Sequence, residues 1–292
     1  MLSQMAVARS MQYSLNDSRT SLENAVTDCI KSFNQELNGG TTPSHLPMVL
    51  PNFLAPFPLY IHALFRHPSL NIHKIGNETV DFRVNAMCQI NQRPIEGTLM
   101  ELYPSLYRVD NIGDLPKIDS DGDNQAKGDN EENGKKQRQN STGSNDSAAS
   151  NASTSSEIDW ETPNFLPLTA ELLSSQGIFL LDNLDSIIIW VGQNVSTEVM
   201  RNLFGKTFPN ELKEYGQELP IIENSEANKR LREFIGILRS TYAHRPFHAP
   251  VRIVRDDTAF RTTFIRQFLH DRMAGMESYM DFLNRIRQSL NS

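Results

Sequence analysis

The stretch GIFLLDNLDSIIIWVGQNV, from Gly177 to Val195, carries the best strand signal in the chain. Two apolar runs, IFLL and IIIWV, flank a short polar turn near Leu184 and Asp185. Strands that are apolar at successive positions are typical of a sheet covered on both faces. The stretch therefore predicts a buried pair of strands at the centre of a layered domain.

The sequence after this hairpin alternates between helix and strand signals. Ser196 can cap a short helix through TEVMRNLF that ends at Gly205. Ser225 can cap a longer helix, and VRIVR at 251–255 is another strand. One face of the longer helix is apolar: Ala227, Leu231, Phe234, Ile235, Leu238 and Tyr242. This alternation predicts a small sheet sandwiched by helices.

The first part of the chain has helical periodicity. One apolar face contains Leu22, Val26, Cys29, Ile30, Phe33 and Leu37, and Asn38 with two glycines ends it. Prolines at 56 and 58 suit the first turn of a helix through LYIHALFRH, which Pro68 ends. Thr79 can cap VDFRVNAMCQI, and Pro94 can begin IEGTLMELY. Because no hairpin signal interrupts these helices, we expect residues 1–113 to form an all-helical domain.

The C-terminal segment is also predicted to be helical. Phe260, Phe264 and Phe268 recur at intervals of four residues. A second stripe steps by three or four residues: Met276, Tyr279, Leu283, Ile286 and Leu290. Such a stripe needs a partner surface. We expect this segment to return to the first helical domain.

The middle of the chain differs in composition from both sides. From Asp119 to Glu157 it contains no Val, Ile, Leu, Met, Phe, Tyr or Trp. Such a segment cannot bury enough apolar surface to offset its ordering entropy, which predicts a disordered insertion over residues 114–158. Asp119, Asp121 and Asp123 imitate the start of a calcium loop, but the loop's Gly and Glu positions hold Asn124 and Asn130. A solvated acidic run is therefore favoured.

Bulk composition limits the possible classes of protein. The chain has 292 residues and a formal net charge of −7, which argues against a nucleic-acid partner. Cys29 and Cys88 fall in apolar helical patterns, which favours buried thiols in a reducing compartment. No apolar run reaches the ~20 residues that cross a bilayer, and the N-terminus lacks the apolar core of a signal peptide. We therefore expect a cytosolic protein.

The sequence contains no convincing catalytic or metal-binding motif. The triplet at 205–207 resembles the end of a phosphate-binding loop, but Met200 occupies the position of its first glycine. Two histidine pairs lack Cys or carboxylate at metal spacing, namely His62 with His67 and His244 with His248. No G-x-S-x-G elbow is present. We expect no catalytic residues, no cofactor-binding residues and no metal ligands, and hence not an enzyme.

The last part of the chain is more basic than the rest. Residues 225–292 contain 12 Lys and Arg against 7 Asp and Glu. These cations are either the solvated backs of helices or a basic face toward an anionic partner or a membrane surface.

Several of these segments together resemble a known family. The opening stretch, the helices after it and VRIVR look like a gelsolin-like module. Together with four further segments, that module resembles the C-terminal region of the cargo-binding subunit of the COPII coat, the Sec24 family. The four segments are LPLYIHALFRHPSL, DFRVNAMCQI, LMELYPSLYRVD and DDTAFRTTFIRQFLHDRMAGMESYMDFLNRI. The resemblance covers nearly the whole chain outside the polar insertion.

The resemblance implies an α+β fold in four parts. These are an all-helical domain at 1–113, the insertion at 114–158, a gelsolin-like domain at 159–249, and a closing strand and helical segment at 250–292. In calcium-binding gelsolin repeats a Gly-Asp pair precedes the first strand, and the matching positions here are Gln176 and Gly177. The carboxylate is missing. We therefore expect no calcium ion, and expect Asp182, Asn183 and Asp185 to make turn hydrogen bonds.

The resemblance also implies function and partners. It implies a non-enzymatic coat component in transport from the endoplasmic reticulum to the Golgi, peripherally associated with the cytosolic face of the reticulum membrane and with coated vesicles. Its partners would be other coat subunits, above all the GTPase-activating sister subunit, and cargo sorting signals, with no nucleic acid. No cofactor is implied in this region, since the family's zinc site and trunk domain would precede residue 1.

Two alternative functions remain. The sister subunit shares the order of helical and gelsolin-like domains and supplies an arginine to its GTPase, a role that we assign neither to Arg201 nor to any other residue. An actin-binding gelsolin-family protein is the other alternative, for which several tandem repeats and calcium carboxylates are expected.

Overall fold

The structure is a computed structural model that describes residues 2–39, 48–73, 79–118, 159–213, 219–242, 245, 248–273 and 275–291. Residues 1–114 and 163–292 make one compact unit, and residues 115–162 make a second. Of the second unit, 115–118 and 159–162 are described, and they pair through an antiparallel bridge between Lys117 and Trp160. The predicted disordered insertion lies outside the described residues between 119 and 158.

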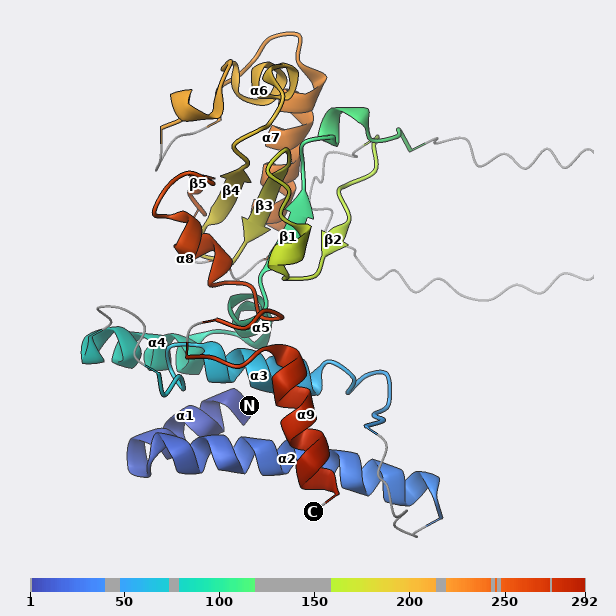
Figure 1. Cartoon of the computed structure of the whole chain (residues 1–292), viewed down its shortest axis with the longest axis vertical. Helices are drawn as coiled ribbons and strands as arrows, with labels where there is room; N and C mark the ends of the chain where they lie inside the picture. The colour runs from blue at the N-terminus through green and yellow to red at the C-terminus, as the bar shows by residue number, and fades with distance from the viewer. Residues whose placement is uncertain are drawn as a thin grey trace, which may run out of the picture. The chain divides into compact units, whose positions relative to one another are not determined.

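Helices make up the first part of the larger unit (Figure 1). They are α1 (Leu2–Gln12), α2 (Leu15–Leu37), α3 (Phe57–Arg66), α4 (Val80–Gln92) and α5 (Ile95–Leu102). α1 is an addition to the sequence-based prediction. It buries only Ala6 and Val7, so its sequence has no apolar stripe to detect.

No helix in the described part of the chain is long and apolar enough to cross a membrane.

Local capping residues set the ends of these helices, and Thr79 and the glycine after α2 do so as predicted. The Thr79 hydroxyl accepts a hydrogen bond from the amide of Phe82 at the start of α4. Gly39, just beyond α2, has a positive φ of 62°, which glycine adopts without steric cost. At the start of α2, Ser14 and Asp17 form a reciprocal capping box.

The two cysteines are less buried than the sequence indicated. Cys29 is half-buried on α2, and Cys88 is exposed on α4. α4 instead buries Ala86, Met87 and Ile90, which turns Cys88 toward solvent. The prediction of two buried thiols is therefore wrong for Cys88.

The chain returns to the helical domain at its end, as predicted. Ser278 and Asp281 form a capping box at the start of α9 (Tyr279–Leu290), and α9 packs on α2 and α3 (Figure 1). Phe282, Ile286 and Leu290 are buried in this contact. Ile286 and Leu290 belong to the predicted stripe, whereas Tyr279 and Leu283 of that stripe are half-buried and Phe282 was not predicted.

A five-stranded sheet forms the second layer of the unit, in the order β2-β1-β3-β4-β5. The strands are β1 (Ser105–Arg108), β2 (Phe165–Leu166), β3 (Ile178–Asp182), β4 (Ile187–Val191) and β5 (Val251–Arg255). β3 and β4 form the predicted antiparallel hairpin, and every residue of both is buried. β5 runs parallel to β4, and β1 lies antiparallel between β2 and β3.

The strand β1 corrects the expectation of an all-helical segment over 1–113. Leu106 pairs with Leu181 of β3 on one side and with Leu166 of β2 on the other. The polypeptide before the insertion therefore supplies an interior strand of the sheet. A four-residue strand after a proline carries too little periodicity to be recognised without its partners.

Helices cover both faces of this sheet. On one face, Phe234 of α7 (Glu226–Thr241) contacts Tyr107, with ring centroids 5.0 Å apart. On the other, Phe264 of α8 (Arg261–Ile265) stacks on Trp190 at 6.3 Å. α6 (Thr197–Phe204) packs against α7 and ends at Gly205, in a left-handed conformation. The sandwiched sheet that the apolar strands predicted is confirmed.

The aromatic stripe near the C-terminus is not one continuous helix. α8 spans five residues, and Phe268 lies beyond its end. Phe264 and Phe268 are nevertheless both buried. The stripe correctly predicted core residues and overestimated the length of the helix.

Candidate functional site

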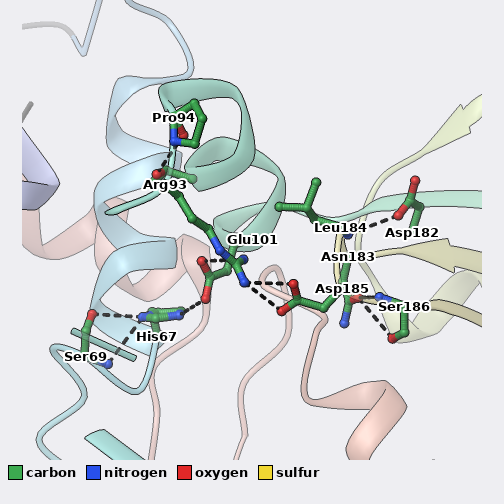
Figure 2. A network of polar contacts seen from close by, with 11 residues as sticks. His67, Ser69, Arg93, Pro94, Glu101, Asp182, Asn183, Leu184, Asp185 and Ser186 are labelled. Carbon is green, nitrogen blue, oxygen red and sulfur yellow. Dashed lines mark hydrogen bonds and ion pairs between the residues drawn. The ribbon is translucent and has the colours of Figure 1, made fainter. Parts of the chain in front are cut away.

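A network of charged side chains links the helical domain to the β3–β4 turn (Figure 2). Arg93 stands at its centre. Its Nη1 donates to Oε2 of Glu101 at 2.8 Å, and its Nη2 donates to both carboxylate oxygens of Asp185 at 2.7 and 3.0 Å. One guanidinium thus binds a helix of the first domain and the turn of the sheet.

The backbone around Arg93 explains its position. Arg93 ends α4 with extended angles, φ −75° and ψ 144°, which a residue before proline prefers. Pro94 then begins α5, and Glu101 lies near the end of that helix. The break between α4 and α5 therefore directs Arg93 toward both carboxylates.

His67 extends the network at the end of α3. Its Nε2 lies 3.0 Å from Oε1 of Glu101, and its Nδ1 lies 2.8 Å from the hydroxyl of Ser69. The side chains of His67 and Glu101 are only 10% and 12% exposed. Glu101 is thus held by two partners in a site with little access to water.

The turn between β3 and β4 has the hydrogen bonds predicted for two of its three polar residues. Oδ1 of Asp182 accepts from the amide of Leu184, which has a φ of 72°. Oδ1 of Asn183 accepts from both the amide and the hydroxyl of Ser186. The prediction was wrong for Asp185, because its carboxylate accepts from Arg93 instead.

Asp182 is the most deeply buried acid of the sheet. Its carboxylate is fully buried and accepts from Nη2 of Arg245 at 2.6 and 2.9 Å. Burial raises the pKa of Asp182, while the positive charge of Arg245 acts in the opposite direction. The pair ties the end of β3 to the connection between α7 and β5.

The position that holds calcium in other gelsolin repeats carries no carboxylate here. The amide of Gln176 donates to the Ser174 hydroxyl, and a Cβ on Gly177 would lie 2.7 Å from the Phe179 ring. Within the described residues no group of three or more His, Cys, Asp and Glu side chains is placed to hold a metal ion. The Gln176 amide thus makes a local hydrogen bond just before β3.

The remaining motifs from the sequence have structural roles. His62 bonds to the Leu269 carbonyl and His67 to Glu101, so that pair does not converge on a common point. His244 lies outside the described residues. Gly205 caps α6, as expected for the triplet that begins there.

Many arginines of the basic C-terminal part bind internal acceptors, a role that the sequence did not reveal. Arg239 donates twice to the Ala249 carbonyl, and Arg255 donates to the Asn210 carbonyl. Others make ion pairs: Arg230 with Glu226, Arg245 with Asp182, Arg261 with Asp256, Arg272 with Asp281, and Arg285 with Glu23 and Glu277. Contacts within the fold thus occupy many of these cations, which weakens the case for a basic face toward a membrane.

Comparison with known proteins identifies the domain family of the helical layer and that of the sheet layer. Residues 1–100 match the Sec23/Sec24 helical domain, and residues 162–235 match the gelsolin repeat. The chain therefore combines a Sec23/Sec24 helical domain with a gelsolin repeat.

Sec24 proteins are homologous to this chain over its whole length, which confirms the predicted resemblance to the Sec24 family. Human protein transport protein Sec24A is 28% identical over 291 residues, covering 100% of this chain and 23% of the relative. Protein transport protein SEC24 of Komagataella pastoris is 26% identical, covering 98% of this chain and 29% of the relative. The chain thus spans about a quarter of the length of these relatives.

A solved structure supports the fold. The crystal structure of the human COPII-coat protein Sec24c matches 99% of this chain and 30% of that chain, with a TM-score of 0.70 and 18% identity. The similarity to Sec24 proteins favours the Sec24 family over the actin-binding and GTPase-activating alternatives.

Proposed function

We propose that this chain acts as part of a COPII cargo adaptor in transport from the endoplasmic reticulum to the Golgi. The observation that carries the proposal is homology to Sec24 proteins across both the helical domain and the gelsolin repeat. The mechanism is binding rather than catalysis. The helical domain supplies a rigid frame, and the Arg93 network and α9 tie the gelsolin-like sheet to it.

The same homology supports a set of proposed partners. They are the GTPase-activating sister subunit, other coat subunits and the sorting signals of membrane proteins. The chain works on the cytosolic face of the reticulum membrane, held there through its partners, and needs no cofactor in this region and no nucleic acid.

A replacement experiment tests the proposal. The segment of human Sec24A that aligns with this chain is exchanged for the chain itself, and export of a membrane cargo from the endoplasmic reticulum is measured in cells lacking the native protein. We expect the chimera to assemble with the other coat subunits and to restore export of the membrane cargo. A chimera that folds but neither joins the coat nor restores export would remove the proposal.

A GTP hydrolysis assay separates the adaptor from the sister subunit. We expect no stimulation of the coat's small GTPase by this chain. Stimulation that disappears in Arg201→Ala would assign the GTPase-activating role instead.

A further inference from the structure

A pocket of about 470 Å³ opens in the helical domain beside α2, α3 and the segment before α9. Its charged lining consists of Arg19 and Glu23 from α2, Arg66 from α3, and Glu277 and Arg285 near and within α9. The pocket is separate from the Arg93 network. Segments distant in sequence therefore bring three arginines to one cavity.

Arg19 is held rigidly at the wall of this pocket. Its Nη1 donates to the carbonyls of Phe65 and Leu70, each at 3.0 Å. Its guanidinium also stacks 4.1 Å from the centre of the Phe65 ring. Its Nε and Nη2 make no hydrogen bond with the described part of the chain. A fixed guanidinium with one open edge is prepared to accept an anion.

Arg66 adds a second cation to the lining of the pocket. It is 8% exposed, and its Nη1 donates to the carbonyls of Leu269 and Asp271 at 3.0 and 2.8 Å. Its Nε and Nη2 are buried without a partner among the described residues. Unpaired buried donors are costly, and a nearby anion would relieve that cost.

The charged side chains that line the pocket sum to one positive charge, and Asp271, outside the lining, offsets part of the charge of Arg66. Arg285 binds Glu23 through Nη1 and Glu277 through Nη2, so one arginine is shared by both carboxylates. Within the described residues neither Arg19 nor Arg66 makes an ion pair. His62 also lines the pocket, and burial lowers its pKa to about 4, so it is neutral near pH 7.

We propose that this pocket binds one carboxylate of an apolar peptide segment, with Arg19 donating to it and Arg66 adding positive charge from the same lining. A single excess positive charge matches a carboxylate better than a phosphate, which carries close to two negative charges at neutral pH. A planar carboxylate also fits the guanidinium edge. Phe65, Ile72 and Met276 in the lining provide contact for an adjoining apolar side chain. The inference goes beyond the proposed function, since binding is a property of this chain whether or not it acts in a coat.

Titration of the full 292-residue chain with short peptides tests this site. The probes are acetyl-leucyl-glutamyl-leucine amide, with a side-chain carboxylate, and acetyl-leucyl-glutaminyl-leucine, with a terminal carboxylate. The third probe is a neutral peptide, acetyl-leucyl-glutaminyl-leucine amide. The fourth probe is inorganic phosphate. The readout is the NMR signals of the His62 and His73 rings, which both line the pocket. We expect one or both carboxylate peptides to shift these signals, with binding about tenfold or more tighter than that of the neutral peptide.

Matched variants decide whether the shifts report this pocket. Thr20 and Ser32 are both exposed on α2, and only Thr20 lines the pocket. We expect Thr20→Glu to abolish binding, because it adds a competing carboxylate, and Ser32→Glu to leave it unchanged. Arg66→Gln should also lose binding, but Arg66 supports the fold, so Thr20→Glu is the deciding variant. Equal binding of the neutral peptide, binding of phosphate alone, no shift at all, or an unaffected Thr20→Glu variant would each overturn the proposal.

Discussion

At the scale of single residues, His62 makes the stability of the fold depend on pH. The side chain is fully buried, and its Nε2 lies 3.1 Å from the Leu269 carbonyl, which makes that nitrogen the donor. Burial, followed by the charge of Arg66, lowers the pKa of His62 to about 4, while Glu277 and the Leu269 carbonyl raise it and His270 lowers it further.

The sign of the resulting pH dependence follows from linkage. In the unfolded chain His62 takes up its proton near pH 6.5, but in the folded chain only near pH 4. As the pH falls through this window, the unfolded state binds more protons, so the free energy of unfolding decreases, by at most about 3 kcal/mol from this group. Urea titrations from pH 7 to pH 4.5 should show a shallower decrease for His62→Gln than for the wild type. Parallel pH profiles for the two proteins would contradict the assignment.

Two glycines predict stability changes of opposite sign. A Cβ on Gly192, just after β4, would meet the carbonyl oxygen of Ser175 and lie 3.0 Å from that of Ser174. Gly236 lies inside α7, and a Cβ there would have nothing within 4 Å. We expect Gly192→Ala to reduce the free energy of unfolding by about 2 kcal/mol or more and Gly236→Ala to increase it by ~0.5–1 kcal/mol. Urea unfolding measures both, and equal effects of the two substitutions would refute the steric argument.

At the scale of elements, the sequence predicted those structural features that depend only on residues close together in the chain. Thr79, Ser196 and Ser225 cap their helices as predicted, because the capping hydroxyl and the amide that donates to it lie within three residues of each other. β1 could not be found this way, because its four residues become a strand only through pairing with β3. The same holds for Asp185, whose partner Arg93 lies 92 residues away.

The Arg93 network should stabilise the attachment of the β3–β4 turn. Arg93→Met leaves Glu101, which is 12% exposed, with the His67 imidazole as its remaining side-chain partner. We expect the free energy of unfolding to fall by about 1–3 kcal/mol. Because Asp185 is 40% exposed, a double-mutant cycle with Asp185→Asn should give a coupling of only about 0.5–1 kcal/mol.

A surface arginine provides the control for this substitution. Arg201 is exposed on α6 and makes no ion pair within the described residues. Arg201→Met should change the free energy of unfolding by no more than about 0.5 kcal/mol. If Arg93→Met were as mild as Arg201→Met, the network would have no structural role.

At the scale of the whole molecule, the polypeptide on each side of residues 119–158 contributes to both layers. The part before contributes β1 to the sheet, between β2 and β3. The part after contributes α9 to the helical domain, where it packs on α2 and α3. Neither layer is therefore complete with only one of the two parts, which explains why the predicted boundary at 113 does not separate the helices from the sheet.

This exchange of elements predicts that two separate fragments, residues 1–118 and 159–292, reassemble when they are expressed together. Leu106 on β1 is fully buried between two strands, whereas Asn111 just beyond it is exposed. Co-purification of a tagged first fragment with the second should succeed for the wild type and for Asn111→Glu, and fail for Leu106→Glu, because a buried carboxylate without a partner is too costly. Fragments that stay apart, or a Leu106→Glu fragment that still binds, would show that the two layers are independent. Reassembly would instead mean that pairing of β1 and packing of α9 suffice to join the two layers without a covalent connection.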